Sequence, residues 1–396
     1  MSRLKFIKIL AGLFALAGLL SLTACSSITD IKTNISDRIF GREAAELPEP
    51  LADFKETSNS KILWQAKVGN AGYFEFSPAV EAGYAYAASA EGEVVKLDVS
   101  NGSQVWRVKV PESLSGGVGA GGSLVLVGTQ RGSIYAYDIA GKLQWISKLS
   151  SEVLSAPKYY DGTVIVRTGD SRIFGINAND GSRKWVYDRT TPSLALRSSA
   201  GIVVEGGAVY AGFAGGKLVA VRADNGKLLW EASVAQPKGV TEIERIADIT
   251  SLPVVDGPLV YAVAYQGKIA AVDRVAGRVV WSRDISSLAG LNVEDGRIFV
   301  SHAAGSIYAL DYTTGKTFWR QAALKNRQLT APLPLGNLVA VGDVEGYVHF
   351  LSREDGAQAS RIKTDNSPMM PQLALINSNT VLAQTRDGGV YAIQVK

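Results

Sequence analysis

The chain offers few side chains that could carry out chemistry. Its 396 residues include one cysteine and two histidines. Cys25 has no second cysteine with which to form a disulfide or a metal cluster within the chain. His302 and His349 lie in strand-like runs and lack the close spacing of paired histidine metal ligands. These residues predict neither a catalytic base nor a metal site.

Acidic residues recur at regular intervals and invite comparison with a calcium site, which needs several oxygen ligands in one place. Asp98, Asp138, Asp273 and Asp311 each stand three or four residues before a glycine. An aspartate in this position hydrogen-bonds its own backbone in a tight turn, and the glycine supplies a positive φ. We therefore expect these carboxylates to cap turns in successive repeats.

Glycine-rich stretches at 116–122 and 212–217 have neither the spacing nor the strand–turn–helix context of a nucleotide-binding loop. The chain also lacks the Gly-x-Ser-x-Gly motif of a hydrolase nucleophile. We therefore predict no catalytic residues and no bound cofactor. The sequence favours a protein that is not an enzyme.

The N-terminus indicates export. Three basic residues precede an apolar run at 9–20, which is too short to span a membrane comfortably and is typical of a signal peptide. Leu22-Thr23-Ala24-Cys25 resembles a bacterial lipobox, which implies cleavage before Cys25 and attachment of lipid to its thiol. We expect a lipoprotein signal peptide at residues 1–24 and a lipidated tether at residues 25–60, with a short helical turn near 35–40.

Charge gives no support for nucleic-acid binding. The formal net charge is +4, but the leader carries three of the 41 basic residues and none of the 37 acidic ones, which leaves +1. A protein that binds nucleic acid through phosphate contacts needs a clear basic excess.

The elements that position these residues come from a repeat. All seven tryptophans fall on one register, with gaps of 42, 39, 40, 45, 51 and 38 residues between Trp64, Trp106, Trp145, Trp185, Trp230, Trp281 and Trp319. A period near forty is typical of a propeller blade or of a helical pair. Ahead of most tryptophans lie a glycine, a strand-like apolar run and a turn glycine, which favours a β-hairpin over helices.

Most repeats contain a second hairpin, as at Lys158–Arg167, which gives the four strands of one blade. A seventh copy has Ser360 at the tryptophan position, and its outer strand is expected to pack less tightly. An eighth copy at 389–394 stops before its fourth strand, which Ile62–Val68 can supply. We therefore predict an all-β, eight-bladed β-propeller of four-stranded antiparallel blades at residues 61–396, closed by pairing of the N-terminal strand with the C-terminal blade.

The repeat Gly-x-Ile-Tyr-Ala-Leu-Asp-x-x-x-Gly-Lys-x-x-Trp, as at 305–319, resembles that of enzymes dependent on pyrroloquinoline quinone (PQQ), which non-enzymatic propellers share. With the lipobox and a single eight-copy ring, the chain resembles the BamB family of lipoproteins of the outer-membrane β-barrel assembly (BAM) complex. The resemblance implies a noncatalytic scaffold that is lipid-anchored in the outer membrane and faces the periplasm. It also implies binding to the POTRA domains of BamA and to other BAM members, and contact with unfolded barrel clients.

Two segments, 192–197 and 241–248, resemble the surface with which the family binds BamA. The resemblance assigns the contact to Leu194, Leu196 and Arg197 from the first segment and to Arg245 and Asp248 from the second. The family pattern often has a second acid two positions after Asp248, where this chain has Thr250. The acidic half of the predicted contact is correspondingly weaker.

The spacing independently favours these segments. The two longest tryptophan gaps, 45 and 51 residues, place both in connections between consecutive blades, which emerge on one face of a propeller. An alternative interpretation is that Leu194 and Leu196 cover a blade interface while Arg245 pairs internally with Asp248.

Two other functions compete with the scaffold. In a PQQ-dependent dehydrogenase the central channel would hold PQQ and calcium, but the resemblance to those enzymes implies a longer chain and, in many, a vicinal disulfide that one cysteine cannot form. A periplasmic lipoprotein that binds the cell wall is the second alternative. Aromatic residues near the first blade, such as Tyr73 and Phe76, would suit any of these functions.

Overall fold

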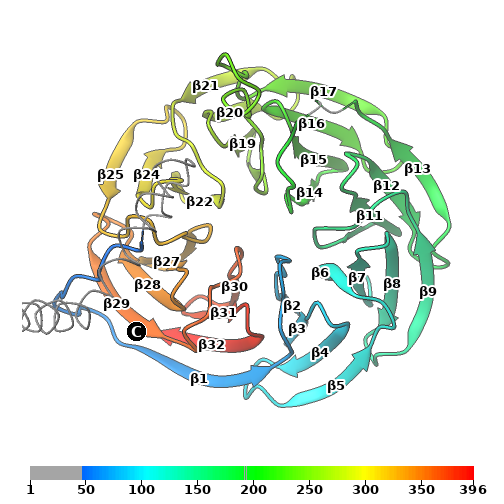
Figure 1. Ribbon diagram of the computed structural model, residues 1–396, viewed down its shortest axis with the longest axis horizontal. Helices are drawn as coiled ribbons and strands as arrows, with labels where there is room; N and C mark the ends of the chain where they lie inside the picture. The colour runs from blue at the N-terminus through cyan, green and yellow to red at the C-terminus, as the bar shows by residue number, and fades with distance from the viewer. Residues whose placement is uncertain (1–46, 191, 193) are drawn as a thin grey trace, which may run out of the picture. The chain divides into compact units, whose positions relative to one another are not determined.

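The computed structural model describes residues 47–190, 192 and 194–396. From Pro48 to Lys396 the chain forms one unit, in which 32 strands make eight four-stranded antiparallel sheets arranged as the blades of a ring (Figure 1). The predicted signal peptide, Cys25, most of the predicted tether and its helical turn lie outside the described residues. Within the described part, no helix has the length and apolar character needed to cross a membrane.

The first four blades follow the chain in order. Blade 1 consists of β2 (Ala79–Glu81), β3 (Tyr84–Ala88), β4 (Glu93–Asp98) and β5 (Gln104–Lys109). Blade 2 consists of β6 (Leu114–Gly121), β7 (Leu124–Thr129), β8 (Ser133–Asp138) and β9 (Leu143–Lys148). Blade 3 consists of β10 (Lys158–Tyr160), β11 (Thr163–Arg167), β12 (Ile173–Asn177) and β13 (Arg183–Tyr187). Blade 4 consists of β14 (Ile202–Glu205), β15 (Ala208–Phe213), β16 (Lys217–Arg222) and β17 (Leu228–Ser233).

The remaining blades complete the circle. Blade 5 consists of β18 (Val254–Asp256), β19 (Leu259–Val263), β20 (Ile269–Asp273) and β21 (Val279–Arg283). Blade 6 consists of β22 (Gly290–Glu294), β23 (Arg297–Ser301), β24 (Ile307–Asp311) and β25 (Thr317–Gln321). Blade 7 consists of β26 (Leu333–Leu335), β27 (Leu338–Gly342), β28 (Tyr347–Ser352) and β29 (Gln358–Lys363). Blade 8 consists of β30 (Ala374–Asn377), β31 (Thr380–Gln384), β32 (Gly389–Val395) and β1 (Ser60–Lys67).

The ring closes through the two ends of the propeller. β1 pairs antiparallel with β32, from Ser60 opposite Val395 to Lys67 opposite Gly389. This pairing gives the C-terminal blade its outer strand, so the predicted fold class and its closure are confirmed. Closure removes the open blade face that an incomplete ring would expose to other chains.

Each tryptophan joins its own blade to the next one. The Trp185 indole nitrogen donates to the Ala223 carbonyl oxygen of blade 4 at 3.1 Å. Its ring lies over Gly226, where an added Cβ would come within 2.5 Å of ring atoms. The acceptors in the turns of the following blades are Val99, Ile139, Ala178, Ala223, Arg274, Tyr312 and Arg353. The tryptophan and the turn glycine of the repeat therefore form one contact between neighbouring blades.

Ser360 of β29 marks the one blade boundary where this contact is replaced. Blade 8 has no hairpin between its third and fourth strands, because those strands come from opposite ends of the chain. The N–H groups of Thr57 and Ser58 instead donate to the Ala359 carbonyl oxygen at 3.0 and 3.2 Å. Ser360 is fully buried, and its hydroxyl has no hydrogen-bond partner among the described residues, so the expectation of looser packing in this strand stays a prediction.

The segment before β1 makes hydrogen bonds and a cation–π contact with blade 7 and the connector before it. Arg327 is buried and donates from Nε to the Asp343 carboxylate at 2.7 Å and from a terminal nitrogen to the Glu49 carbonyl oxygen at 2.8 Å. Farther along, the Arg361 guanidinium lies 5.3 Å from the centre of the Phe54 ring. Residues 48–59 thus contact blade 7 and the connector that leads into it before the ring-closing strand begins.

Candidate protein-binding surface

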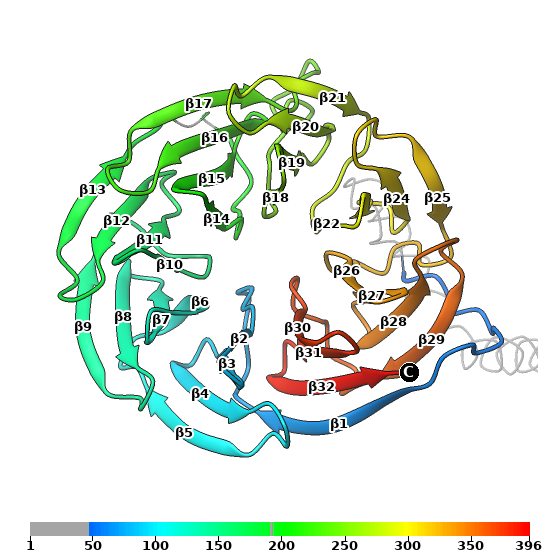
Figure 2. The same ribbon diagram turned by 180° about the vertical axis from the view of Figure 1, so that it is seen from behind.

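Two long connectors lie on one face of the ring. Residues 188–201 link β13 to β14, and residues 234–253 link β17 to β18. Both run from an outer strand to the inner strand of the next blade, and Figure 2 shows blades 3, 4 and 5 side by side around the ring. The topology therefore brings together the two segments that contain the predicted contact residues.

Asp248 joins the two connectors beneath the surface. Its side chain is only 3% exposed. One carboxylate oxygen accepts a hydrogen bond from the Leu196 N–H at 2.7 Å, and the other accepts one from the Gly215 N–H at 2.9 Å. A buried carboxylate needs such donors, because its desolvation is otherwise unfavourable. Asp248 thus fixes the backbone of the first connector against the second connector and against blade 4.

Arg167 supplies a positive charge near this buried carboxylate. Burial lowers the pKa of Arg167 to about 10, while the neighbouring Asp248 carboxylate acts in the opposite direction. The guanidinium donates to the Ala200 carbonyl oxygen at 2.8 Å and lies 4.7 Å from the centre of the Phe213 ring. The end of the first connector is therefore attached to blade 3 as well as to the second connector.

Arg197 is exposed but held in one orientation. Its Nε and a terminal nitrogen donate to the two Glu152 carboxylate oxygens at 3.0 and 2.6 Å. This bidentate bond raises the pKa of Arg197, and burial of part of the side chain opposes the shift. The guanidinium also lies 5.3 Å from the centre of the Phe74 ring. Such paired arginines lose little conformational entropy when a partner binds.

Arg245 lies in a tight turn of the second connector. Thr241 and Glu244 form a reciprocal pair there: the Glu244 N–H donates to the Thr241 hydroxyl at 3.2 Å, and the Thr241 N–H donates to the Glu244 carboxylate at 3.1 Å. Arg245 is exposed and forms an ion pair with Glu242 at 3.8 Å. It makes this pair in place of the internal pair with Asp248 that the alternative interpretation requires.

Apolar side chains are exposed in both connectors. Leu194 is 44% exposed, whereas Leu196 is half-buried against the ring. Val240 and Ile243, which sequence analysis did not single out, are 96% and 68% exposed on the second connector. The signal that could have found them is an apolar residue within a long polar connector. We call the surface formed by Leu194, Arg197, Val240, Ile243 and Arg245 the two-connector patch.

The chemistry of the two-connector patch suits protein binding. Each arginine has its own carboxylate partner, so their charges are balanced, and three apolar side chains are exposed in the same patch. Arginine and large apolar residues are typical anchors at the centre of protein interfaces. The roles of Leu194, Leu196 and Arg197 in partner binding stay predictions, as do those of Arg245 and Asp248.

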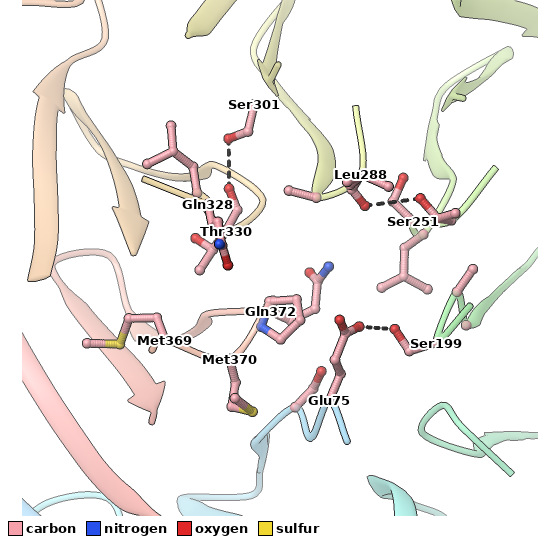
Figure 3. Close-up of a pocket in the computed structure, with 18 of the residues that line it drawn as sticks. Glu75, Ser199, Ser251, Leu288, Ser301, Gln328, Thr330, Met369, Met370 and Gln372 are labelled. Carbon is pink, nitrogen blue, oxygen red and sulfur yellow. Dashed lines mark hydrogen bonds between the residues drawn. The ribbon is translucent and has the colours of Figure 1, made fainter. Parts of the chain in front are cut away.

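A cavity of about 440 Å³ lies in the central channel on the same face, between the ends of the connectors. Small polar residues line much of it, including Ser199, Ser251, Gln328 and Gln372 (Figure 3). Glu75 is the one acidic residue of its lining, and its carboxylate accepts a hydrogen bond from the Ser199 hydroxyl. This donor set does not fit calcium, which takes six to eight oxygen ligands.

The repeated acids do not supply the missing ligands. The Asp138 carboxylate accepts hydrogen bonds from the N–H groups of Ala140 and Lys142, both at 2.9 Å, and Asp98, Asp273 and Asp311 cap their own turns in the same way. This confirms the prediction that they stabilise hairpins. Among the described residues, histidine, cysteine and acidic side chains nowhere gather in a group of three that could hold a metal ion.

Comparison with known proteins gives one consistent family. A family model described as outer membrane protein assembly factor BamB matches residues 54–114, 90–321 and 268–396. The outer membrane protein assembly factor BamB of Nitrosomonas eutropha is 38% identical over 382 residues, which cover 96% of this chain and 93% of that protein.

Solved structures show the same fold. The crystal structure of BamB from Moraxella catarrhalis superimposes with a TM-score of 0.78 at 29% identity, covering 85% of this chain and all of that one. The quinohemoprotein alcohol dehydrogenase of Comamonas testosteroni has a TM-score of 0.68 at 14% identity, covering 91% of this chain and 82% of that one. At that identity the likeness to the dehydrogenase shows a shared fold alone.

Proposed function

Because this chain belongs to the BamB family of outer membrane protein assembly factors, we propose that it is a noncatalytic scaffold that binds BamA through the two-connector patch. The observation that carries the proposal is the attachment of the two connectors to each other by Asp248, which presents apolar and arginine side chains together. A POTRA domain of BamA and the neighbouring BAM subunits are the proposed partners.

The patch is arranged to bind without extensive refolding. Glu152 and Phe74 hold Arg197 in place, and the Thr241–Glu244 turn holds the segment that contains Ile243 and Arg245. A partner that covers this surface gains the burial of apolar area while paying little for ordering the loops. Preorganisation of this kind supports a stable subunit contact.

We propose that a lipid anchor attaches the protein to the outer membrane. Residues 1–24 are proposed to be removed, Cys25 to carry the lipid, and residues 25–60 to connect it to the propeller at 61–396, at the periplasmic side of the outer membrane. More than one acyl chain is needed for stable anchoring, as bacterial lipoproteins provide. A Cys25→Ser variant whose leader is exchanged for the cleavable signal peptide of a non-lipidated periplasmic protein is expected in the soluble periplasmic fraction. Its full retention in the outer membrane would contradict this role of Cys25.

Unfolded barrel proteins are proposed as transient clients at the blade edges. The outer strand β13 pairs with β12 on one side only, so its other edge presents free backbone groups. An extended client strand could pair there by β-augmentation. A photo-crosslinker at Lys184 is expected to capture barrel precursors, and capture of none would count against this contact.

Affinity copurification from the native envelope tests the main proposal. The full-length lipoprotein is compared with a variant in which Leu194, Leu196 and Arg197 are all replaced by alanine. We expect BamA with the wild type and little or none with the variant, at equal expression and unchanged thermal stability.

Copurification of BamA in full yield with the variant would show that BamA does not bind through the two-connector patch. The absence of BamA from both preparations would remove the scaffold role and favour a cell-wall partner, which a peptidoglycan pull-down would then detect.

A further inference from the structure

Tyr73 is an exposed aromatic residue that the two-connector patch does not include. Its side chain is 96% exposed. It lies in the connector between β1 and β2, which opens on the same face of the ring as the two long connectors. Covering an exposed tyrosine ring contributes more binding free energy than covering most side chains, because the ring buries a large apolar area and keeps a polar hydroxyl.

Hydrogen bonds and a buried alanine hold the backbone around Tyr73. Phe74 N–H donates to the Ala71 carbonyl oxygen at 3.1 Å, which closes a turn with Tyr73 at its tip. Gly72 has a φ of +60° in this turn, and its N–H donates to the Asn70 side chain at 2.6 Å. Ala71 is fully buried and fixes the turn to the ring. Little backbone entropy would therefore be lost when Tyr73 is covered.

The turn is continuous with the two-connector patch. The Phe74 ring lies 5.3 Å from the Arg197 guanidinium carbon. Glu75, the next residue, accepts a hydrogen bond from the Ser199 hydroxyl of the first connector, as the dashed line in Figure 3 shows. Arg197 of the patch thus contacts both Glu152 and the Tyr73 turn. A partner that binds at Arg197 would therefore lie beside Tyr73.

We propose that Tyr73 is a third anchor of the BamA contact, entering an apolar pocket of the partner whose rim offers a hydrogen bond to the phenolic hydroxyl. This inference rests on the proposed function and extends its surface from two connectors to three. Tyrosine and arginine are the residue types most enriched among the energetically dominant positions of interfaces. The neighbouring Arg197 and Leu194 supply the charged and aliphatic parts of the same contact.

The test is a titration of the purified periplasmic region of BamA from the same organism with the full mature lipoprotein in detergent. Tyr73→Ala is expected to weaken binding about tenfold or more, as loss of an interface anchor does. Tyr73→Phe is expected to weaken it less, because the ring remains. Val275→Ala is the matched control, since Val275 is 88% exposed in the turn between β20 and β21, on the opposite face.

The outcomes separate this inference from the proposed function. If Arg197→Glu weakens binding while Tyr73→Ala binds within about twofold of wild type, the role of Tyr73 is overturned and the scaffold function stands. If the wild type itself fails to bind, both are overturned. Thermal unfolding of each variant guards against misfolding, and Tyr73→Ala is expected to unfold like the wild type because its ring lies in solvent.

Discussion

At the scale of single residues, Asp248 shows how a predicted contact residue can act from beneath a surface. Sequence analysis placed it in the BamA contact together with Arg245. In the structure Arg245 is exposed, whereas Asp248 is buried and accepts hydrogen bonds from Leu196 and Gly215. A sequence gives the type of a loop residue but not its depth, because depth depends on backbone groups far away in the chain.

Replacing Asp248 by alanine is expected to loosen both connectors. The change leaves the Leu196 and Gly215 N–H groups without their acceptor, and an unsatisfied buried donor costs about 1–3 kcal/mol. We expect a loss of that size in the free energy of unfolding by urea, together with faster proteolysis within 188–201. Glu242→Ala, which removes only an exposed ion pair, is the control. Equal behaviour of the two variants would contradict the role of Asp248.

His349 illustrates a buried titratable residue with a structural role. Its Nε2 lies 2.9 Å from the Asp343 carboxylate, and its Nδ1 has no hydrogen-bond partner among the described residues. Nε2 therefore holds the proton of a neutral imidazole. Burial lowers the pKa of His349. Burial is the largest influence on the pKa of Asp343 and acts to raise it, but the hydrogen bonds from His349, the Tyr347 N–H and Arg327 together outweigh it, so the net shift is downward.

These shifts predict a loss of stability in acid. Below about pH 6.5 an unfolded histidine takes up a proton that folded His349 resists, so the free energy of unfolding falls as the pH falls. Asp343 acts in the same direction, but its contribution is lost only at lower pH. His349→Gln, which keeps a donor toward Asp343, is expected to flatten the dependence between pH 7 and 5.

Urea unfolding at several pH values measures this effect, whose slope is at most about 1.4 kcal/mol per pH unit for one proton. His302→Gln is the comparison, because burial also lowers the pKa of His302 but the side chain is only half-buried. The same slope in wild type and His349→Gln would show that His349 is not the titrating group.

At the scale of elements, the blades could be predicted because their signals are local. The hairpin at Lys158–Arg167 forms as the sequence indicates, with Asp161 and Gly162 at φ values of 41° and 69° in a two-residue turn. Each turn glycine also supports a tryptophan ring of the preceding blade, which the spacing alone did not indicate. Blade 8 has no hairpin between its third and fourth strands, so it offers no turn glycine to a tryptophan from blade 7. Ser360 accordingly stands at the tryptophan position of blade 7.

Trp185→Ala tests the contact between blades. The indole is buried, donates to Ala223 and lies over Gly226, so its removal is expected to lower the free energy of unfolding by about 3–5 kcal/mol. Leu229→Ala, at an exposed position of the neighbouring outer strand, is expected to have little effect. Equilibrium denaturation measures both. An unchanged unfolding midpoint for Trp185→Ala would exclude Trp185 from the core.

The connectors could be located from the sequence but not described. Their excess length follows from the tryptophan gaps of 45 and 51 residues. Their contacts involve partners such as Glu152 and Phe74, which lie in other connectors and follow no repeat. For the same reason the exposure of Val240 and Ile243 emerged only with the structure.

At the scale of the whole molecule, closure of the ring determines what the protein can present. Pairing of β1 with β32 leaves no open blade face, so the surface consists of outer strand edges and two sets of loops. Connectors that follow consecutive blades then form a broad surface on one face. A propeller of this kind can bind a partner without a conformational change, which agrees with membership of a family of assembly factors.

Photo-crosslinking in the native envelope tests whether BamA binds through the two-connector patch. A photoreactive residue is placed at position 194 of the full-length lipoprotein, in the two-connector patch, or at position 275 on the opposite face. We expect a BamA adduct from position 194 and none from position 275. A BamA adduct from position 275 alone, or from neither position while BamA copurifies, would contradict binding through the two-connector patch.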